Sequence, residues 1–245
     1  ASASEMNAAA VITKDETCQK FSVRSPLIQP KTSILDPEVL FTLSPSYTAY
    51  SAVDIITHML EGYFTNTETG ESPLQDRMIY AFMLTLMEAT EKSLANPKDY
   101  DARANFMWSG TLAFNGLTTA GMGVVGFPVH MIEHSLSALY DIAHGAGLSI
   151  MLPGWMAWSA KKNPARFARL AREFFQVAEA DDTKAAAAGI AKLKNWFSAL
   201  KSPVSLKEGG IPEGDIEKIA DNAVELARTW KLKDYTKEVI IDVLN

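Results

Sequence analysis

The hydrophobic positions of residues 44–65 repeat with the period of an α-helix. They form one stripe along the predicted helix: Ala49, Ala52, Val53, Ile56, Met59, Leu60 and Phe64. Ser44 and Pro45 precede this stripe as an N-cap residue and a first-turn proline, so the helix is expected to begin there. Further helices are predicted at residues 73–94, 101–118, 128–139, 144–160, 164–179, 183–200, 213–230 and 234–243. The body of the chain is therefore predicted to be a helical bundle.

The first 36 residues follow a different pattern. Two short extended segments, Ala10–Thr13 and Phe21–Arg24, are separated by a polar turn at residues 14–17, and Pro26 and Pro30 follow them. A small β element is expected here. The sequence thus predicts a mainly α fold class, with a short β segment in residues 1–36 and an all-helical domain in residues 37–245.

Composition narrows the classes of partner. The 245 residues are 47% hydrophobic and 21% charged, as is ordinary for a soluble globular core. A net charge of −6 argues against a nucleic-acid surface, and no apolar run is long enough to span a bilayer. The single cysteine, Cys18, cannot form an internal disulfide, which favours a reducing, cytoplasmic setting. Small molecules or protein surfaces are the expected partners.

All four histidines fall into two short clusters. Asp54 and His58 are four residues apart on one predicted helix, while His130, His134 and His144 lie close together further along the chain. Imidazole and carboxylate groups are ligands for divalent metals, and the apolar neighbours of these residues would make an unpaired ring costly to bury. Five ligands exceed what a catalytic site uses, so one histidine should lie beside the ion. Spacing alone does not identify it.

Several motifs carry a family resemblance. They are Leu35-Asp-Pro-Glu38, Leu43-Ser-Pro45, Val53-Asp54-x-x-x-His58-x-x-Glu61, His130-x-x-x-His134 and Leu139-Tyr140-x-x-x-His144-Gly145. From residue 1 to about residue 180, the chain resembles the metal-binding half of the iron-containing (group III) alcohol dehydrogenases and is most similar to their butanol dehydrogenase branch. This resemblance implies a helical fold like the C-terminal domain of dehydroquinate synthase.

The resemblance also implies a set of ligands and a reaction. Fe²⁺, or Zn²⁺ in some members, would be held by Asp54, His58, His130 and His144, with His134 near the nicotinamide and the substrate. The metal would polarise the oxygen of a small alcohol or aldehyde while hydride passes between the substrate carbon and NAD(P). His134 would relay the proton, because imidazole exchanges protons near neutral pH. If it does not, it would orient a neighbouring group.

The implied cofactor contacts are Ser2, Lys20 and Leu40, together with His134. The family's Gly-Thr-Gly-Ser-Glu pattern is matched here by residues 1–5, but both glycines are replaced by alanine. No glycine-rich pyrophosphate loop follows a predicted strand, so residues 1–36 are expected to be the remainder of a nucleotide-binding domain that precedes this sequence. The fragment alone is expected to turn over little substrate, and a homo-oligomer is a further partner to consider.

Two alternatives remain open at this point. A glycerol-dehydrogenase-like or dehydroquinate-synthase-like Zn²⁺ enzyme would share the architecture and a related ligand set. A non-catalytic metal-binding module would use the same ligands without turnover. The aromatic residues Trp108, Phe114, Phe127 and Trp155 fall at helical spacing among apolar neighbours, so they are predicted to pack in the core.

Overall fold

The structure of the protein is a computed structural model that describes residues 3–66 and 72–245. These residues are mainly helical and contain a two-stranded sheet near the N-terminus, which confirms the predicted fold class. They divide into two compact units, Ala1–Phe127 and Pro128–Asn245. The assignment of residues 1–36 to a nucleotide-binding domain stays a prediction. Ser2, one of the predicted cofactor contacts, lies outside the described residues.

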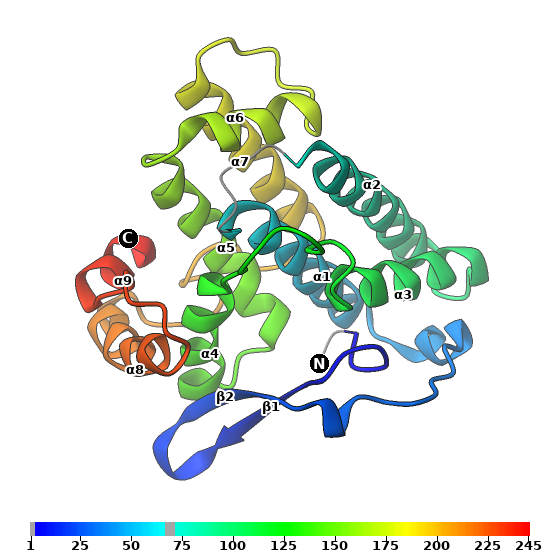
Figure 1. Cartoon of the computed structure of the whole chain (residues 1–245), viewed down its shortest axis with the longest axis horizontal. Coiled ribbons are helices and arrows are strands. Elements are labelled where there is room, and N and C mark those ends of the chain that lie inside the picture. Colours follow the sequence, from blue (N-terminus) through cyan, green and yellow to red (C-terminus); the bar gives the residue numbers. More distant parts are fainter. Residues whose placement is uncertain (1–2, 67–71) are drawn as a thin grey trace. The chain divides into compact units, whose positions relative to one another are not determined.

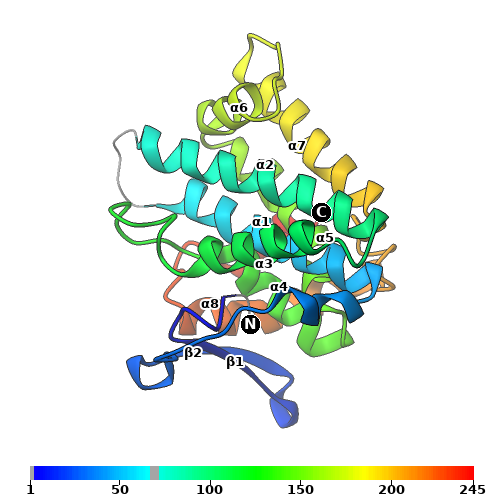
Figure 2. The ribbon, with the colours of Figure 1, turned by 90° about the vertical axis from the view of Figure 1, so that its right-hand side faces the viewer.

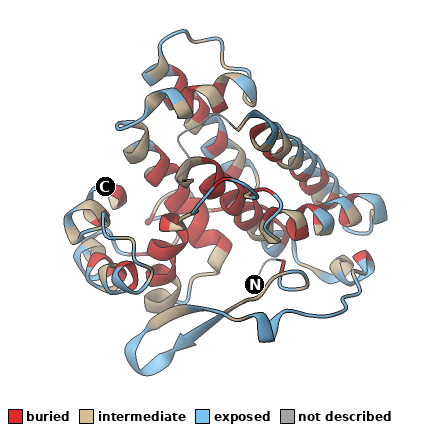
Figure 3. Cartoon of the chain, in the orientation of Figure 1, coloured by how far each residue is buried: buried red, intermediate tan, exposed pale blue. Residues whose placement is uncertain are grey.

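Three helices form the body of the first unit. They are α1 (Pro45–Thr65), α2 (Pro73–Ala95) and α3 (Tyr100–Phe114), and each packs against the other two (Figures 1 and 2). The Ser44 hydroxyl accepts a 3.2 Å hydrogen bond from the backbone N–H of Tyr47, which confirms the predicted start of α1. The middle of α1 is buried around its whole circumference (Figure 3), so its polar side chains lie in the interior.

The helix predicted at residues 101–118 is shorter in the structure. It ends at Phe114, and Gly116 follows with a φ of 97°, a backbone conformation outside the helical region. The periodic pattern continues past this glycine, which explains why sequence spacing extended the helix too far. The early end leaves the Phe114 ring at the C-terminus of α3.

The predicted β element is an antiparallel hairpin. Strands β1 (Ala9–Lys14) and β2 (Gln19–Arg24) pair so that Ala9 opposes Arg24, and the 3-10 helix η1 (Asp15–Thr17) connects them. Most of their side chains are exposed, so the hairpin adds little to the hydrophobic core. Two further 3-10 helices, η2 (Pro26–Ile28) and η3 (Pro37–Thr42), lead from the hairpin to α1.

The second unit is built around an apolar helix. Its α-helices are α4 (Pro128–Tyr140), α5 (His144–Ala160), α6 (Pro164–Glu173), α7 (Asp182–Ala199), α8 (Ile216–Thr229) and α9 (Lys237–Leu244), with the 3-10 helix η4 (Glu213–Asp215) before α8. Helix α5 is buried over most of its length and contacts α4, α6, α7 and α9. Among the described residues, no helix is both long and apolar enough to cross a membrane.

The helix predicted at residues 164–179 ends six residues early, at Glu173. Gln176 adopts a left-handed backbone with a φ of 54°, which a helix cannot continue through. The Arg172 side chain then donates hydrogen bonds to the carbonyl groups of Glu179 and Ala180. A side chain therefore satisfies two backbone acceptors of the extended segment between α6 and α7.

A three-residue turn joins α4 to α5. Asp141 adopts a φ of 52° immediately after α4, and its backbone N–H donates to the carbonyl of Ser137 at 3.1 Å. The chain reverses within residues 141–143, and His144 becomes the first residue of α5. This tight turn brings the start of α5 beside the side chains of α4.

Candidate metal centre

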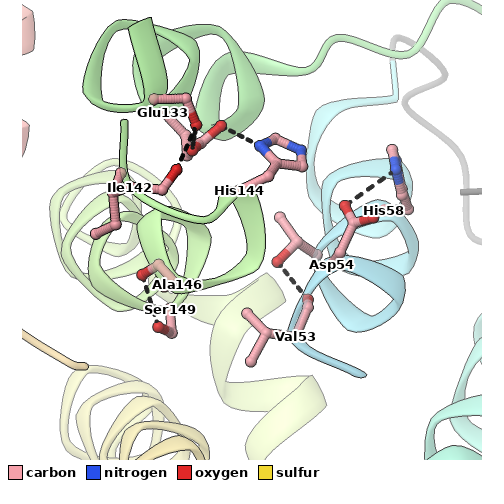
Figure 4. A network of polar contacts seen from close by, with 10 residues as sticks. Val53, Asp54, His58, Glu133, Ile142, His144, Ala146 and Ser149 are labelled. Carbon is pink, nitrogen blue, oxygen red and sulfur yellow. Dashed lines mark hydrogen bonds and ion pairs between the residues drawn. The ribbon is translucent and has the colours of Figure 1, made fainter. Parts of the chain in front are cut away.

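In the first unit, helix α1 places Asp54 and His58 side by side. The Asp54 Oδ1 atom lies 3.3 Å from His58 Nε2, as the four-residue spacing predicts (Figure 4). Both side chains are largely buried, at 13% and 8% exposed respectively. A carboxylate and an imidazole from one helix thus offer oxygen and nitrogen donors at the same place.

Aromatic side chains surround the His58 ring. Phe114 stacks on it with centroids 4.0 Å apart and an angle of 22° between the planes, while Phe127 meets it edge-on at 6.0 Å. The Arg24 guanidinium lies over both phenyl rings, 5.4 Å from the Phe114 centroid and 5.9 Å from that of Phe127. Two half-buried phenyl rings therefore lie beside this histidine, with the exposed Arg24 over them.

The prediction that four aromatic residues pack in the core needs correction. Trp155 is buried, as expected, and donates a hydrogen bond from its indole N–H to the Tyr235 hydroxyl. Trp108 is 48% exposed, because it lies on the outer side of α3, so the prediction is wrong for this residue. Phe114 and Phe127 are half-buried beside His58 rather than enclosed in the core.

In the second unit, α4 and the start of α5 bring together the other three histidines. The His144 ring centroid lies 5.3 Å from that of His130 and 5.5 Å from that of His134. His130 and His134 are buried, whereas the His144 side chain is 29% exposed. The His134 ring also meets Trp230, after α8, edge-on at 5.2 Å. The predicted histidines of this segment therefore form one cluster.

Glu133 is a member of this cluster that the sequence analysis missed. Its side chain is fully buried, it accepts a hydrogen bond from the Ser137 hydroxyl, and its second oxygen lies within hydrogen-bond distance of His144 Nδ1 (Figure 4). Ligand atoms of Glu133, His134 and His144 all lie within 4.8 Å of one another. A carboxylate between two histidines in an apolar segment, four residues before a serine, was the signal available in the sequence.

These donor sets fit a divalent transition metal. Imidazole nitrogen with carboxylate oxygen suits Fe²⁺ and Zn²⁺, and each unit presents such groups in the interior, where an uncompensated charge is expensive. Asp54 with His58 and His130 with His134 each use the four-residue spacing that lets one helix offer two ligands on one face. Each unit therefore contains residues whose chemistry suits the binding of a divalent metal.

Comparison with known proteins identifies the family. The model of the Fe-containing alcohol dehydrogenase family, C-terminal part, matches residues 48–245. The chain belongs to this family. It is 38% identical over 247 residues to the probable NADH-dependent butanol dehydrogenase 1 of Bacillus subtilis, and that match covers the whole chain and 63% of the relative. It is also 35% identical over 218 residues to the NADPH-dependent aldehyde reductase YqhD of Escherichia coli, covering 88% of this chain and 55% of the relative.

Solved structures agree with this membership. The crystal structure of the NADH-dependent butanol dehydrogenase A of Thermotoga maritima superposes with a TM-score of 0.93 at 42% identity, covering 100% of this chain and 63% of that one. The chain thus spans less than two thirds of the length of these alcohol dehydrogenases. The family match reaches residue 245, so the expectation that the resemblance ends near residue 180 is wrong.

The predicted cofactor contacts lie in the first unit. Lys20 is half-buried on β2, and Leu40 is half-buried on η3. Ala3 adopts the left-handed backbone that glycine favours, with a φ of 55°. The Thr111 hydroxyl donates to the Glu5 carboxylate, and the Ser33 hydroxyl donates to the Glu5 carbonyl at 2.7 Å. The segment that follows Ser2 is therefore anchored, while the cofactor contacts themselves stay predictions.

Proposed function

We propose that this chain is the metal-binding part of an NAD(P)-dependent alcohol dehydrogenase or aldehyde reductase that acts on small alcohols and aldehydes. The observation that carries the proposal is the buried Asp54–His58 pair in a chain of the iron-containing alcohol dehydrogenase family. The relatives named as butanol dehydrogenases and as an aldehyde reductase support this substrate class. Their names also include NADH and NADPH, so the proposal covers both nicotinamide cofactors.

The proposed ligands of the metal are Asp54, His58, His130 and His144. One carboxylate and three neutral imidazoles leave the ion with net positive charge and with room for a substrate oxygen. Fe²⁺ is the proposed ion, with Zn²⁺ as the other candidate, since both accept this combination of donors. A bound ion would supply Lewis-acid activation of the substrate oxygen, and a bound nicotinamide would supply hydride transfer.

The chain's own residues supply the proton transfer and the environment of the reaction. His134 is proposed to take up the alcohol proton on its imidazole during oxidation and to return it during reduction, since imidazole exchanges protons near neutral pH. Phe114 and Phe127 shield the His58 side chain from water on the faces they cover. Ser2, Lys20 and Leu40 are proposed to contact the cofactor, with the remaining contacts supplied by a nucleotide-binding domain before residue 37.

The ligand assignment is tested by metal analysis of two variants. His58→Ala should lose the metal because it removes a ligand, whereas His134→Ala should keep the metal and lose turnover in an enzyme that carries both domains. Elemental analysis measures the metal, and aldehyde-dependent oxidation of NADH or NADPH measures turnover. Retained metal in His58→Ala, or lost metal in His134→Ala, would contradict the assignment. X-ray absorption at the iron and zinc edges identifies the ion.

A direct assay tests whether turnover requires a further nucleotide-binding domain. The 245-residue chain incubated with butanol and NADP⁺ should show little or no turnover while it binds the metal. Turnover equal to that of a two-domain relative would contradict the need for a further nucleotide-binding domain.

A further inference from the structure

We propose that Glu133 is a positioning residue that orients His144 for metal binding. This inference rests on the proposed function, since it takes His144 to be a metal ligand. Glu133 itself would touch neither substrate nor ion. Its role would be to fix which nitrogen of the His144 ring carries the proton and which nitrogen faces the metal.

The contacts of Glu133 support this role. Its Oε2 atom lies within hydrogen-bond distance of His144 Nδ1 (Figure 4), and its Oε1 atom accepts from the Ser137 hydroxyl. A carboxylate at Nδ1 favours the tautomer in which Nδ1 carries the proton, because the carboxylate can only accept. The Nε2 lone pair is then available to a metal. Carboxylates bonded in this way also make the imidazole a stronger ligand.

The residues around Glu133 and His144 restrict the position of the Glu133 side chain. A Cβ atom on Gly147 would meet the Glu133 carboxylate and lie 2.8 Å from its Cγ, so any larger residue here would require the Glu133 side chain to shift. Ser137 donates to the carboxylate and lies 3.3 Å from the carbonyl of Ile142, in the turn that leads to His144. One residue on α5 and one on α4 thus confine the Glu133 side chain.

Replacing the buried Glu133 by glutamine distinguishes a metal-related role of this residue from a purely structural one. A fully buried carboxylate is expensive unless a positive charge compensates it. If Glu133 were purely structural, glutamine could replace it with no consequence for metal binding, because glutamine keeps the shape and an acceptor oxygen. If Glu133 positions His144, Glu133→Gln should weaken metal binding while the metal-free protein stays as stable as before.

The experiment is a titration of the metal-free chain with Co²⁺, followed by visible absorption and by thermal unfolding. Glu133→Gln should bind Co²⁺ about 10- to 100-fold more weakly than the wild type, as other carboxylate partners of metal-bound histidines do. Its melting temperature without metal should match or exceed that of the wild type. Glu173→Gln, a matched change at an exposed position on α6, should bind Co²⁺ like the wild type.

The outcomes distinguish this inference from the function on which it rests. If the wild type binds Co²⁺ and Glu133→Gln binds it equally well, the positioning role is wrong and the metal centre stands. If the wild type itself binds no Co²⁺, the metal centre fails, and the role of Glu133 fails with it.

A second measurement needs no stable Glu133 variant. In the Zn²⁺-loaded wild type with ¹⁵N-labelled histidine, the His144 ring signals, assigned by correlation with the His144 backbone, should show a proton on Nδ1. A proton on Nε2 of His144 would overturn the proposal.

Discussion

Phe114 stacks face to face on His58, with the two ring centroids 4.0 Å apart. The ring comes from the last residue of α3, and the histidine comes from the buried middle of α1. A stacked ring restricts rotation of the imidazole about its side-chain bonds without using either ring nitrogen. The contact therefore stabilises one orientation of a proposed ligand and leaves its nitrogens available for other partners.

Phe114→Leu is expected to weaken metal binding. Aromatic pairs contribute about 0.5–1.5 kcal/mol beyond the area that they bury. If that contribution favours the ligand orientation, the affinity for Co²⁺ should fall by about 2- to 12-fold, at 1.4 kcal/mol for each tenfold change. Titration of the metal-free chain measures the change.

Trp108→Leu is the matched control for this variant. Trp108 lies on the same helix but is half exposed, so its replacement should leave Co²⁺ affinity unchanged. Equal affinities for Phe114→Leu and the wild type would show that stacking does not position His58.

The sequence predicts the contacts of the candidate site that depend on helical spacing, but not the contacts that depend on how the helices end and pack. The Asp54–His58 contact depends only on the helical repeat, so spacing predicted it. The Phe114 contact depends on where α3 ends and how it packs on α1, and neither is encoded in a local period. The extended helix prediction placed Phe114 inside a helix, which made core packing the natural interpretation.

Gly147→Ala is expected to lower the stability of the fold, because the added methyl group would meet Glu133. The contact is with the buried carboxylate, and Glu133 is held in place by Ser137 and His144. Overpacking of this kind costs about 1–3 kcal/mol. Urea unfolding of the single and double variants forms the test. In the Glu133→Ala background the cost of Gly147→Ala should largely disappear, because the space is then open.

A cost that is equal in both backgrounds would contradict this explanation. It would assign the effect of Gly147→Ala to another part of α5. Coupling between residues in contact commonly reaches about 0.5–3 kcal/mol, which such a cycle resolves.

Tyr140 should titrate at unusually high pH. Burial raises the pKa of its hydroxyl to about 12, and the 2.8 Å hydrogen bond to the Asp215 carboxylate acts in the same direction. Since the folded pKa exceeds the ordinary value of about 10, the stability this group contributes is complete below pH 10. It is lost as the pH rises from about 10 through about 12.

Absorbance at 295 nm measures this titration. The difference between the wild type and Tyr140→Phe isolates the Tyr140 transition, which should lie near pH 12. Asp215→Asn removes the negative charge, so the transition should move to lower pH while burial keeps it above the ordinary range. A transition at the ordinary tyrosine value in the wild type would contradict the role given to burial and to Asp215.

The Glu133–His144 contact is a second feature that could not be predicted from the sequence. The three-residue turn between α4 and α5 sets this contact, and it depends on a left-handed residue, Asp141, that has no distinctive sequence signal. Aspartate tolerates this conformation, but it is common in many other settings. The histidines could be grouped from sequence, whereas the carboxylate that orients one of them required the three-dimensional turn.

Lys201→Gly is expected to stabilise the second unit. Lys201 follows α7 with a φ of 61°, and the backbone N–H groups of Lys201 and Ser202 donate to the carbonyls of Ser198 and Phe197. This is the Schellman arrangement, in which glycine is the usual residue because a side chain in the left-handed region costs about 1–2 kcal/mol. Glycine also gives the unfolded chain more freedom, which offsets about 0.4–1 kcal/mol. The net gain should lie between about 0 and about 1.6 kcal/mol, seen as a higher urea midpoint. Lys194→Gly, at an exposed position inside α7, should lower the midpoint instead, because glycine in a helix interior costs about 1 kcal/mol. A lower midpoint for both variants would show that the lysine at position 201 makes a contact worth more than the strain it carries.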